Sequence, residues 1–187
     1  FILKLQNDMQ TVLAELRTVA EGIDPLQVET ACQMIADAGR IMLYGCGREG
    51  LQIQGFAMRL HHLGKLVSMQ GDMAAPPMMQ GDLFIVSAGP GALATVSALI
   101  GQAKAGGASI LFLTAQAQSQ TAKIVDHTIL VTAQTMANDQ KKDASTLPMG
   151  SLYEGALFVL FEAMILKLIV DLDQTPGSIR ARHTNME

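Results

Sequence analysis

The chain has 187 residues, enough for one well-buried domain and short for two, so we expect residues 1–187 to form a single domain. The net charge of −4 comes without a basic block, which excludes nucleic acid as the expected partner. Hydrophobic residues make up 49% of the chain and charged residues only 16%, so we expect an aliphatic core and some apolar surface buried between subunits.

Cysteine use and hydropathy indicate a cytoplasmic protein without a membrane span. Cys32 and Cys46 are the only cysteines, and they show neither a disulfide framework nor the spacing of metal ligands. The first ten residues do not resemble a signal peptide. The longest apolar run, 157–170, is interrupted by Glu162 and Lys167, which predicts a buried helix. No metal or cofactor is expected.

Two helices are predicted before the first strand. Over residues 1–20, apolar side chains recur at steps of three and four, as on one face of a helix. Asp24 followed by Pro25 is typical of a helix start, because aspartate caps free N–H groups and proline suits the first turn. Gly39 is expected to end this second helix.

Apolar strands then alternate with helices. The strands are predicted at 41–44, 66–69, 82–87, 109–114 and 127–131. Between them, helices are predicted from the first glycine turn to residue 64, at 93–105 and near 121. This alternation predicts an α/β fold with a parallel sheet covered on both faces.

The last part of the chain is predicted to contain a loop, a helix and a tail. Residues 134–149 are polar, with a proline near their end, which predicts an exposed loop. A long apolar helix is predicted from 150 to about 172, followed at 180–187 by a charged tail.

Gly45, Gly47 and Gly50 form a turn between the first strand and a helix. The free N–H groups at such a helix start favour an anion. The spacing also fits a dinucleotide site, which needs an acidic residue after the second strand, where Asp72 is an imperfect match. Alternatively, the glycines only let the helix pack closely on the strand. The turn alone leaves these interpretations open.

A second glycine-rich turn, at 88–91, follows Ser87 at the end of the third strand. Both turns therefore lie at the carboxyl ends of strands, where open parallel sheets bind ligands. We expect two helix starts to face one crevice, which favours a ligand site over packing alone.

Five stretches together carry a family resemblance: GCGREG at 45, FAMRLHHLG at 56, GDLFIVSAG at 81, GSLYEG at 150 and ARHTNME at 181. In this order they resemble the sugar isomerase (SIS) domain family, and within it the 6-phospho-3-hexuloisomerases. The resemblance implies a five-stranded parallel sheet in an α-β-α sandwich, with two amino-terminal helices, assembled as a homodimer or homotetramer. It also implies a sugar or sugar phosphate ligand.

In that family the two turns resemble G-x-G-x-S-G and S-x-S-G-E-T, and their hydroxyls and helix amides hold a sugar phosphate. Here Glu49 replaces the first serine, although a carboxylate in a first helical turn also suits the helix dipole. Pro90 removes a backbone donor and Ala92 has no hydroxyl. Each lost hydrogen bond to a charged group is worth roughly 1.5–3 kcal/mol, so phosphate binding is weakened unless other residues substitute. The substrate-binding residues implied are Gly45, Gly47, Arg48, Glu49, Arg59, Ser87, Gly89 and Gly91.

Glu154 aligns with the acidic residue that resembles the proton-transfer base of these isomerases. Moving a carbonyl between adjacent sugar carbons needs a group that takes a proton from one carbon and returns it to the next through an enediol. Without the resemblance, Ser151 to Glu154 is a capping box before an apolar run, which is a purely structural role.

Two histidines are further catalytic candidates by resemblance. His62 and Arg59 match the family's A-M-R-L-x-H-L-G stretch, and three-residue spacing lets them share a helix face. His183 resembles a tail histidine that related isomerases bring to a neighbouring subunit's site for ring opening. The alternatives are that His62 and Arg59 are ordinary positions on a half-buried helix and that His183 is a solvated tail residue.

The sequence therefore predicts a sugar or sugar phosphate isomerase that works without a cofactor through Glu154. The alternative is a SIS domain that has lost catalysis and binds a sugar or sugar phosphate as a regulatory module. The replaced residues in the two turns favour that alternative.

Overall fold

Five parallel strands form the centre of the molecule, which the computed structural model describes over residues 2–140 and 145–186. They are β1 (Ile41–Gly45), β2 (Val67–Met69), β3 (Leu83–Ser87), β4 (Ser109–Thr114) and β5 (His127–Leu130). Their order in the sheet is β2-β1-β3-β4-β5. β1 pairs with both β2 and β3, so the chain adds β2 on one side of β1 and the later strands on the other side. Such a switch point leaves a crevice outside the carboxyl ends of the strands.

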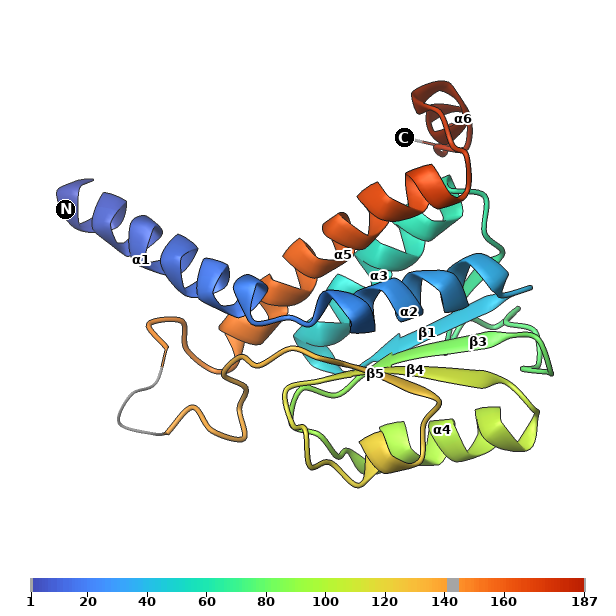
Figure 1. The fold of residues 1–187 in the computed structure, drawn as a ribbon, viewed down its shortest axis with the longest axis horizontal. Coiled ribbons are helices and arrows are strands. Elements are labelled where there is room, and N and C mark those ends of the chain that lie inside the picture. The colour runs from blue at the N-terminus through green and yellow to red at the C-terminus, as the bar shows by residue number, and fades with distance from the viewer. Residues whose placement is uncertain (1, 141–144, 187) are drawn as a thin grey trace.

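Helices cover both faces of the sheet (Figure 1). One face carries α2 (Pro25–Asp37), α3 (Gly47–His62) and α5 (Ser151–Asp171), and the other carries α4 (Ala94–Ala105). The predicted three-layer α/β fold is confirmed. Within residues 2–140 and 145–186, none of the helices is both long and apolar enough to cross a bilayer.

Helix α1 (Ile2–Glu21), blue in Figure 1, extends away from the rest of the molecule. Val19, near its end, is its one buried residue among those described. The apolar side chains of its first turns are exposed, among them Ile2, Leu5, Met9 and Leu13. An amphipathic helix of this kind needs an apolar partner for its exposed stripe.

The core is divided by the sheet into two clusters. Leu43, Ile85 and Leu111 belong to the cluster under α2, α3 and α5. Phe84 and Phe112 belong to the cluster under α4. Successive residues of a strand point to opposite faces, so a strand buried on both faces must be apolar throughout. This is why the strands read as continuous apolar runs in the sequence.

One helix differs from the prediction. Residues 180–187 were expected to be a charged tail, but α6 (Pro176–Ala181) extends into this segment. A capping box starts it: Ser178 N donates to Thr175 Oγ1 at 3.1 Å and Thr175 N donates to Ser178 Oγ at 3.0 Å. Six residues are too few to show helical periodicity, so only this cap identifies the helix.

The predicted exposed loop at 134–149 is partly buried. Thr135 is 2% exposed and its N–H donates to Asn138 Oδ1 at 2.8 Å. Residues 141–144 of this loop lie outside the described residues, as do residue 1 of the first predicted helix and residue 187 of the tail. The polar composition of this loop therefore does not show that the segment around Thr135 is buried.

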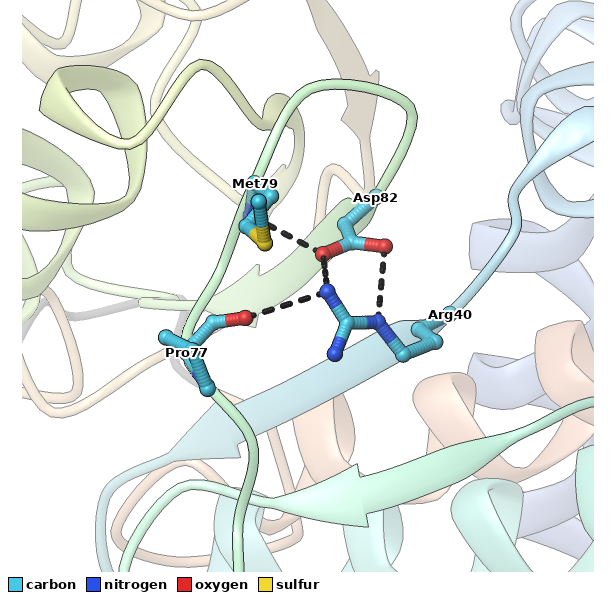
Figure 2. A network of polar contacts seen from close by, with 4 residues as sticks. All are labelled: Arg40, Pro77, Met79 and Asp82. Atoms are coloured by element: carbon cyan, nitrogen blue, oxygen red, sulfur yellow. Dashed lines mark hydrogen bonds and ion pairs between the residues drawn. The ribbon is translucent and has the colours of Figure 1, made fainter.

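An ion pair ties together the amino ends of the two central strands (Figure 2). Arg40, just before β1, donates from Nε to Asp82 Oδ1 at 3.1 Å and from Nη2 to Asp82 Oδ2 at 2.7 Å. Asp82, just before β3, is 6% exposed and also accepts from Met79 N at 2.9 Å. Arg40 Nη2 reaches Pro77 O at 3.2 Å, so the ion pair also anchors the loop before β3.

Replacing Asp82 with alanine should therefore destabilise the protein. The change leaves the Arg40 guanidinium and Met79 N without their shared acceptor. We expect the free energy of unfolding, measured in urea, to fall by about 2–3 kcal/mol. Asp8→Ala is the control, because it removes an exposed pair with Lys4 and should change stability by less than about 0.5 kcal/mol. Equal effects of the two substitutions would contradict this role of Asp82.

Candidate active site

The first glycine turn meets a packing requirement between β1 and α3. A Cβ atom on Gly50 would lie 2.5 Å from the carbonyl oxygen of Gly45, and a Cβ on Gly45 would lie 3.1 Å from the backbone of Gly50. Gly47 has a φ of +57° and open space around it, so it serves the turn itself. For Gly45 and Gly50, the structure therefore bears out the packing interpretation.

Glu49 joins the two glycine turns. Gly45 and Ser87 are paired at the ends of β1 and β3, so the turns that follow them are neighbours. Ser87 Oγ donates to Glu49 Oε2 at 2.6 Å, and Gly89 N donates to the two carboxylate oxygens at 3.1 and 3.0 Å. Burial raises the pKa of Glu49, and the bonds from Ser87 and Gly89 partly offset this.

Tyr153, a residue that the sequence analysis did not select, extends this network. Its hydroxyl oxygen lies 3.1 Å from Ser87 Oγ. Because Ser87 gives its single proton to Glu49, the tyrosine hydroxyl donates to Ser87. Burial and the nearby Glu49 carboxylate raise the pKa of Tyr153 well above its usual value, which keeps the phenol protonated.

Glu154, in the first turn of α5, forms an ion pair with Arg48 in the first turn of α3. Arg48 Nε lies 3.1 Å from Glu154 Oε2, and its other nitrogens donate to Ser151 Oγ at 3.0 Å and to Met149 O at 2.7 Å. Burial raises the pKa of Glu154 and the Glu49 carboxylate adds to this, while Arg48 lowers it.

The capping-box interpretation of Ser151 and Glu154 is wrong. Helix α5 begins after Gly150, which has a φ of +81° and is itself the N-cap residue, so Ser151 lies in the first turn and not at the cap. Arg48 instead engages both side chains from across the site. The local sequence pattern fits a cap, but a residue about a hundred positions earlier provides a stronger, charged partner.

Glu49 and Glu154 line one cavity of about 380 Å³ at the carboxyl ends of β1 and β3. This volume lies in the range of small-molecule sites. Thr135 from the partly buried loop also lines it, and so do Cys46, Gly47, Arg48, Pro90, Leu93, Met136, Met149, Gly150 and Tyr153. The sequence analysis missed Thr135, Met136, Met149 and Tyr153. Of these, Tyr153 could have been predicted, because it directly precedes Glu154 in the GSLYEG stretch.

Gly89 and Gly91 shape the second turn. A Cβ on Gly89 would lie 3.0 Å from the side chains of Thr135 and Tyr153. Gly91 has a φ of +92°, and a Cβ there would lie 2.7 Å from the Gln116 side chain. Glycine at these two positions lets the turn fit against the wall of the cavity.

The other three predicted site residues lie at the opposite end of α3. Arg59 donates to the two carboxylate oxygens of Glu162 at 3.1 and 3.2 Å, and the rings of His62 and His183 stack with centroids 5.2 Å apart. The sixteen residues of α3 span about 24 Å between its two ends. Within one chain, Arg59, His62 and His183 therefore form a second cluster, apart from Glu154.

The tail is held beside this cluster by Arg182. Its Nη1 donates to His62 O at 3.0 Å and to Gln174 Oε1 at 2.8 Å. A cavity of about 660 Å³ opens here, lined by Met58, Arg59, His62, Ile179, Arg180, His183 and Thr184. The structure thus brings His62 and His183 together as neighbours.

A family model supplies the context for this geometry. Residues 34–153, which include both glycine turns, match the model described as SIS domain. The chain belongs to the SIS domain family. Asp72, which the dinucleotide alternative needs, instead accepts from Met69 N at 2.8 Å within its own turn.

Relatives and solved structures match this SIS chain over nearly its whole length. The protein named 3-hexulose-6-phosphate isomerase from Methylomonas aminofaciens is 36% identical over 174 residues, covering 92% of each chain. Its namesake from Mycobacterium gastri is 32% identical over 183 residues, covering 98% of this chain and 92% of the relative. A crystal structure from Methanococcus jannaschii, whose authors infer the same function for it, shares the fold with a TM-score of 0.80, 24% identity and coverage of 98% and 99%.

The packing role of the first turn can be tested with two glycine substitutions in the same SIS helix. Gly50→Ala places a methyl group against the backbone of Gly45, and we expect a loss of about 1–3 kcal/mol in urea unfolding. Gly55→Ala is the matched control, because nothing lies within 4 Å of its Cβ position. Alanine there should stabilise the helix by about 0.5–1 kcal/mol. A neutral Gly50→Ala would contradict the close contact.

Proposed function

We propose that the protein is an aldose–ketose isomerase that moves a carbonyl between adjacent carbons of a sugar or sugar phosphate, with Glu154 as the proton-transfer base. The observation that carries this proposal is the position of the Glu154 carboxylate, in a ligand-sized cavity beside the Arg48 guanidinium at 3.1 Å. The relatives named 3-hexulose-6-phosphate isomerase support the same reaction class.

The reaction needs one base and no net oxidation. Glu154 takes the proton from the carbon next to the carbonyl, and the electron pair forms the double bond of an enediol. The protonated carboxyl then returns the proton to the former carbonyl carbon. The hydroxyl proton on the neighbouring carbon passes to the former carbonyl oxygen, and the neighbouring oxygen becomes the new carbonyl. Arg48, paired with Glu154 at 3.1 Å, orients this carboxylate for both transfers.

The environment of Glu154 suits this role. Its side chain is 15% exposed, and the pKa raised by burial and by Glu49 makes it a stronger base than a solvated glutamate. The Arg48 guanidinium opposes that rise in pKa and favours the ionised carboxylate.

The proposed function also involves self-association of the chain. We infer that copies of this single-domain, cytoplasmic chain associate as a homodimer or homotetramer through apolar side chains exposed on α1 and α5. On α5 these are Phe158, Leu166 and Val170, which are 58%, 68% and 77% exposed. In such an assembly, His183 of one subunit serves ring opening in the site of another. His183 is an exposed residue that stacks on His62, at the end of α3 away from Arg48 and Glu154, and this supports the arrangement.

Replacing the base tests the function directly. Glu154→Gln keeps the size of the side chain but removes its basicity, so kcat for sugar isomerisation should fall by about 10²–10⁴-fold. Asp171→Asn is the control, since it makes the same chemical change at the far end of α5 and should leave kcat within about twofold. Proton exchange between substrate carbon and deuterated water, followed by NMR, measures the same step. Binding without turnover in the unmodified protein would instead support the regulatory alternative.

The pH profile gives an independent test. Glu154 must be ionised to act as a base, so kcat/KM should fall as pH drops through its pKa, which lies above the ordinary glutamate value of 4.5. Arg48→Met removes the charge that lowers this pKa, so the acidic limb should move to higher pH. Lys123→Met, on an exposed residue of the 3-10 helix Thr121–Lys123, should leave the limb in place. If the acidic limb of the Arg48→Met variant stays in place or moves to lower pH, Arg48 does not lower the pKa of the catalytic base.

A further inference from the structure

The second glycine turn has its hydrogen-bond donors already engaged. Ala88 N donates to the backbone of β4 at 3.0 Å, Gly89 N donates to Glu49, and Gly91 N donates to Ala88 O at 2.9 Å. Pro90 has no N–H. From 88 to 91, each backbone donor therefore has a partner within the chain.

The carboxylate of Glu49 lies where these donors converge. It accepts from Ser87 Oγ and from Gly89 N, the kind of hydroxyl and amide donors that hold an anionic oxygen. A phosphate group that used the same donors would have to displace Glu49 from a mostly buried position. The chain thus carries its own anion at this point.

Charge in the cavity acts in the same direction. Among the residues that the structure describes, its charged lining side chains are Arg48, Glu49 and Glu154, a formal sum of −1. The cation in this described set, Arg48, is already paired with Glu154 and bonded to Ser151 and Met149. A phosphate dianion entering here meets two carboxylates and one committed guanidinium, and like charges at such distances repel strongly in a partly buried site.

Glu49 retains the capacity to bind a hydroxyl. A carboxylate has about four acceptor positions, and the donors from Ser87 and Gly89 account for three contacts. Because Glu49 lines the cavity, a ligand there can reach its carboxylate. A sugar hydroxyl can donate to a carboxylate, whereas a fully ionised phosphate group has no proton to donate.

We propose that Glu49 sets the substrate class of this site, which takes a sugar whose terminal carbon carries a free hydroxyl and rejects its phosphate ester. This deepens the proposed isomerase function and rests on it for the identity of the ligand as a sugar. Glu49 acts as the specificity residue, while Glu154 acts as the base.

Calorimetric titration of the full chain with inorganic phosphate tests this proposal without any turnover. The unmodified protein should show no saturable binding, whereas Glu49→Ser restores a small hydroxyl and frees Gly89 N. We expect the variant to gain at least about a hundredfold in phosphate affinity, which equals about 2.8 kcal/mol at 1.4 kcal/mol per tenfold. Glu49→Gln, which keeps the size but removes the charge, should gain less than Glu49→Ser and serves as the second variant if Glu49→Ser does not fold.

A paired titration with fructose and fructose 6-phosphate then reads the specificity. The unmodified protein should bind the phosphate ester no better than the free sugar, and the Glu49 variants should reverse that order. Saturable phosphate binding by the unmodified protein, or no gain in either variant, would overturn the proposal. These titrations measure binding, whereas the Glu154→Gln experiment measures turnover. The role of Glu154 as base and the role of Glu49 in specificity can therefore be refuted independently.

Discussion

A half-buried carboxylate joins the two strand-to-helix turns that border the candidate site. Glu49 starts from the first turn of α3 and accepts hydrogen bonds from the end of β3 and the turn beyond it. Since β1 and β3 are adjacent at the switch point of the sheet, this one side chain fixes the distance between the two strand-to-helix turns. The position of the cavity, the orientation of Tyr153 and the charge around Glu154 all depend on it.

The two ends of the central strands are built differently. At the amino ends, Arg40 and Asp82 form a two-bond ion pair, and both residues also bond the neighbouring loop. At the carboxyl ends, Arg48 pairs with Glu154 while Glu49 has only Ser87 and Gly89 as partners, so the described residues leave an excess of negative charge beside the cavity. A satisfied pair stabilises the fold, whereas an unbalanced cluster raises the pKa of a carboxyl, as the proposed base requires.

The distribution of polar clusters along α3 relates the fold to assembly. One end of the helix carries Arg48 and Glu49, and the other carries Arg59 and His62, which stacks on His183 from the tail. A rigid helix keeps these clusters about 15–21 Å apart along its axis, which does not favour a single copy bringing them together at one substrate. The exposed apolar residues of α1 and α5 are the surface through which, in the proposed assembly, a second copy brings them together.

The sequence by itself determined the α/β architecture, the two glycine turns and the position of Glu154, because these depend on short-range properties. Apolar runs predict buried parallel strands, Asp24 and Pro25 predict a helix start, and glycines mark turns where the backbone needs positive φ or close contact. A six-residue helix such as α6 lies below the length at which periodicity is visible.

Only the tertiary structure decided how the polar side chains are paired. Glu49 finds its partner 38 residues along the chain, and Arg48 reaches Ser151 across 103 residues. The spacing within Ser151 to Glu154 is the same whether those residues cap a helix or face a distant guanidinium. The separation of His62 and His183 from Glu154 likewise follows from the length and direction of α3 in the folded chain. Contacts of this kind depend on which strand ends become neighbours in space. Local sequence patterns do not determine this, because they reflect only residues that are close in the chain.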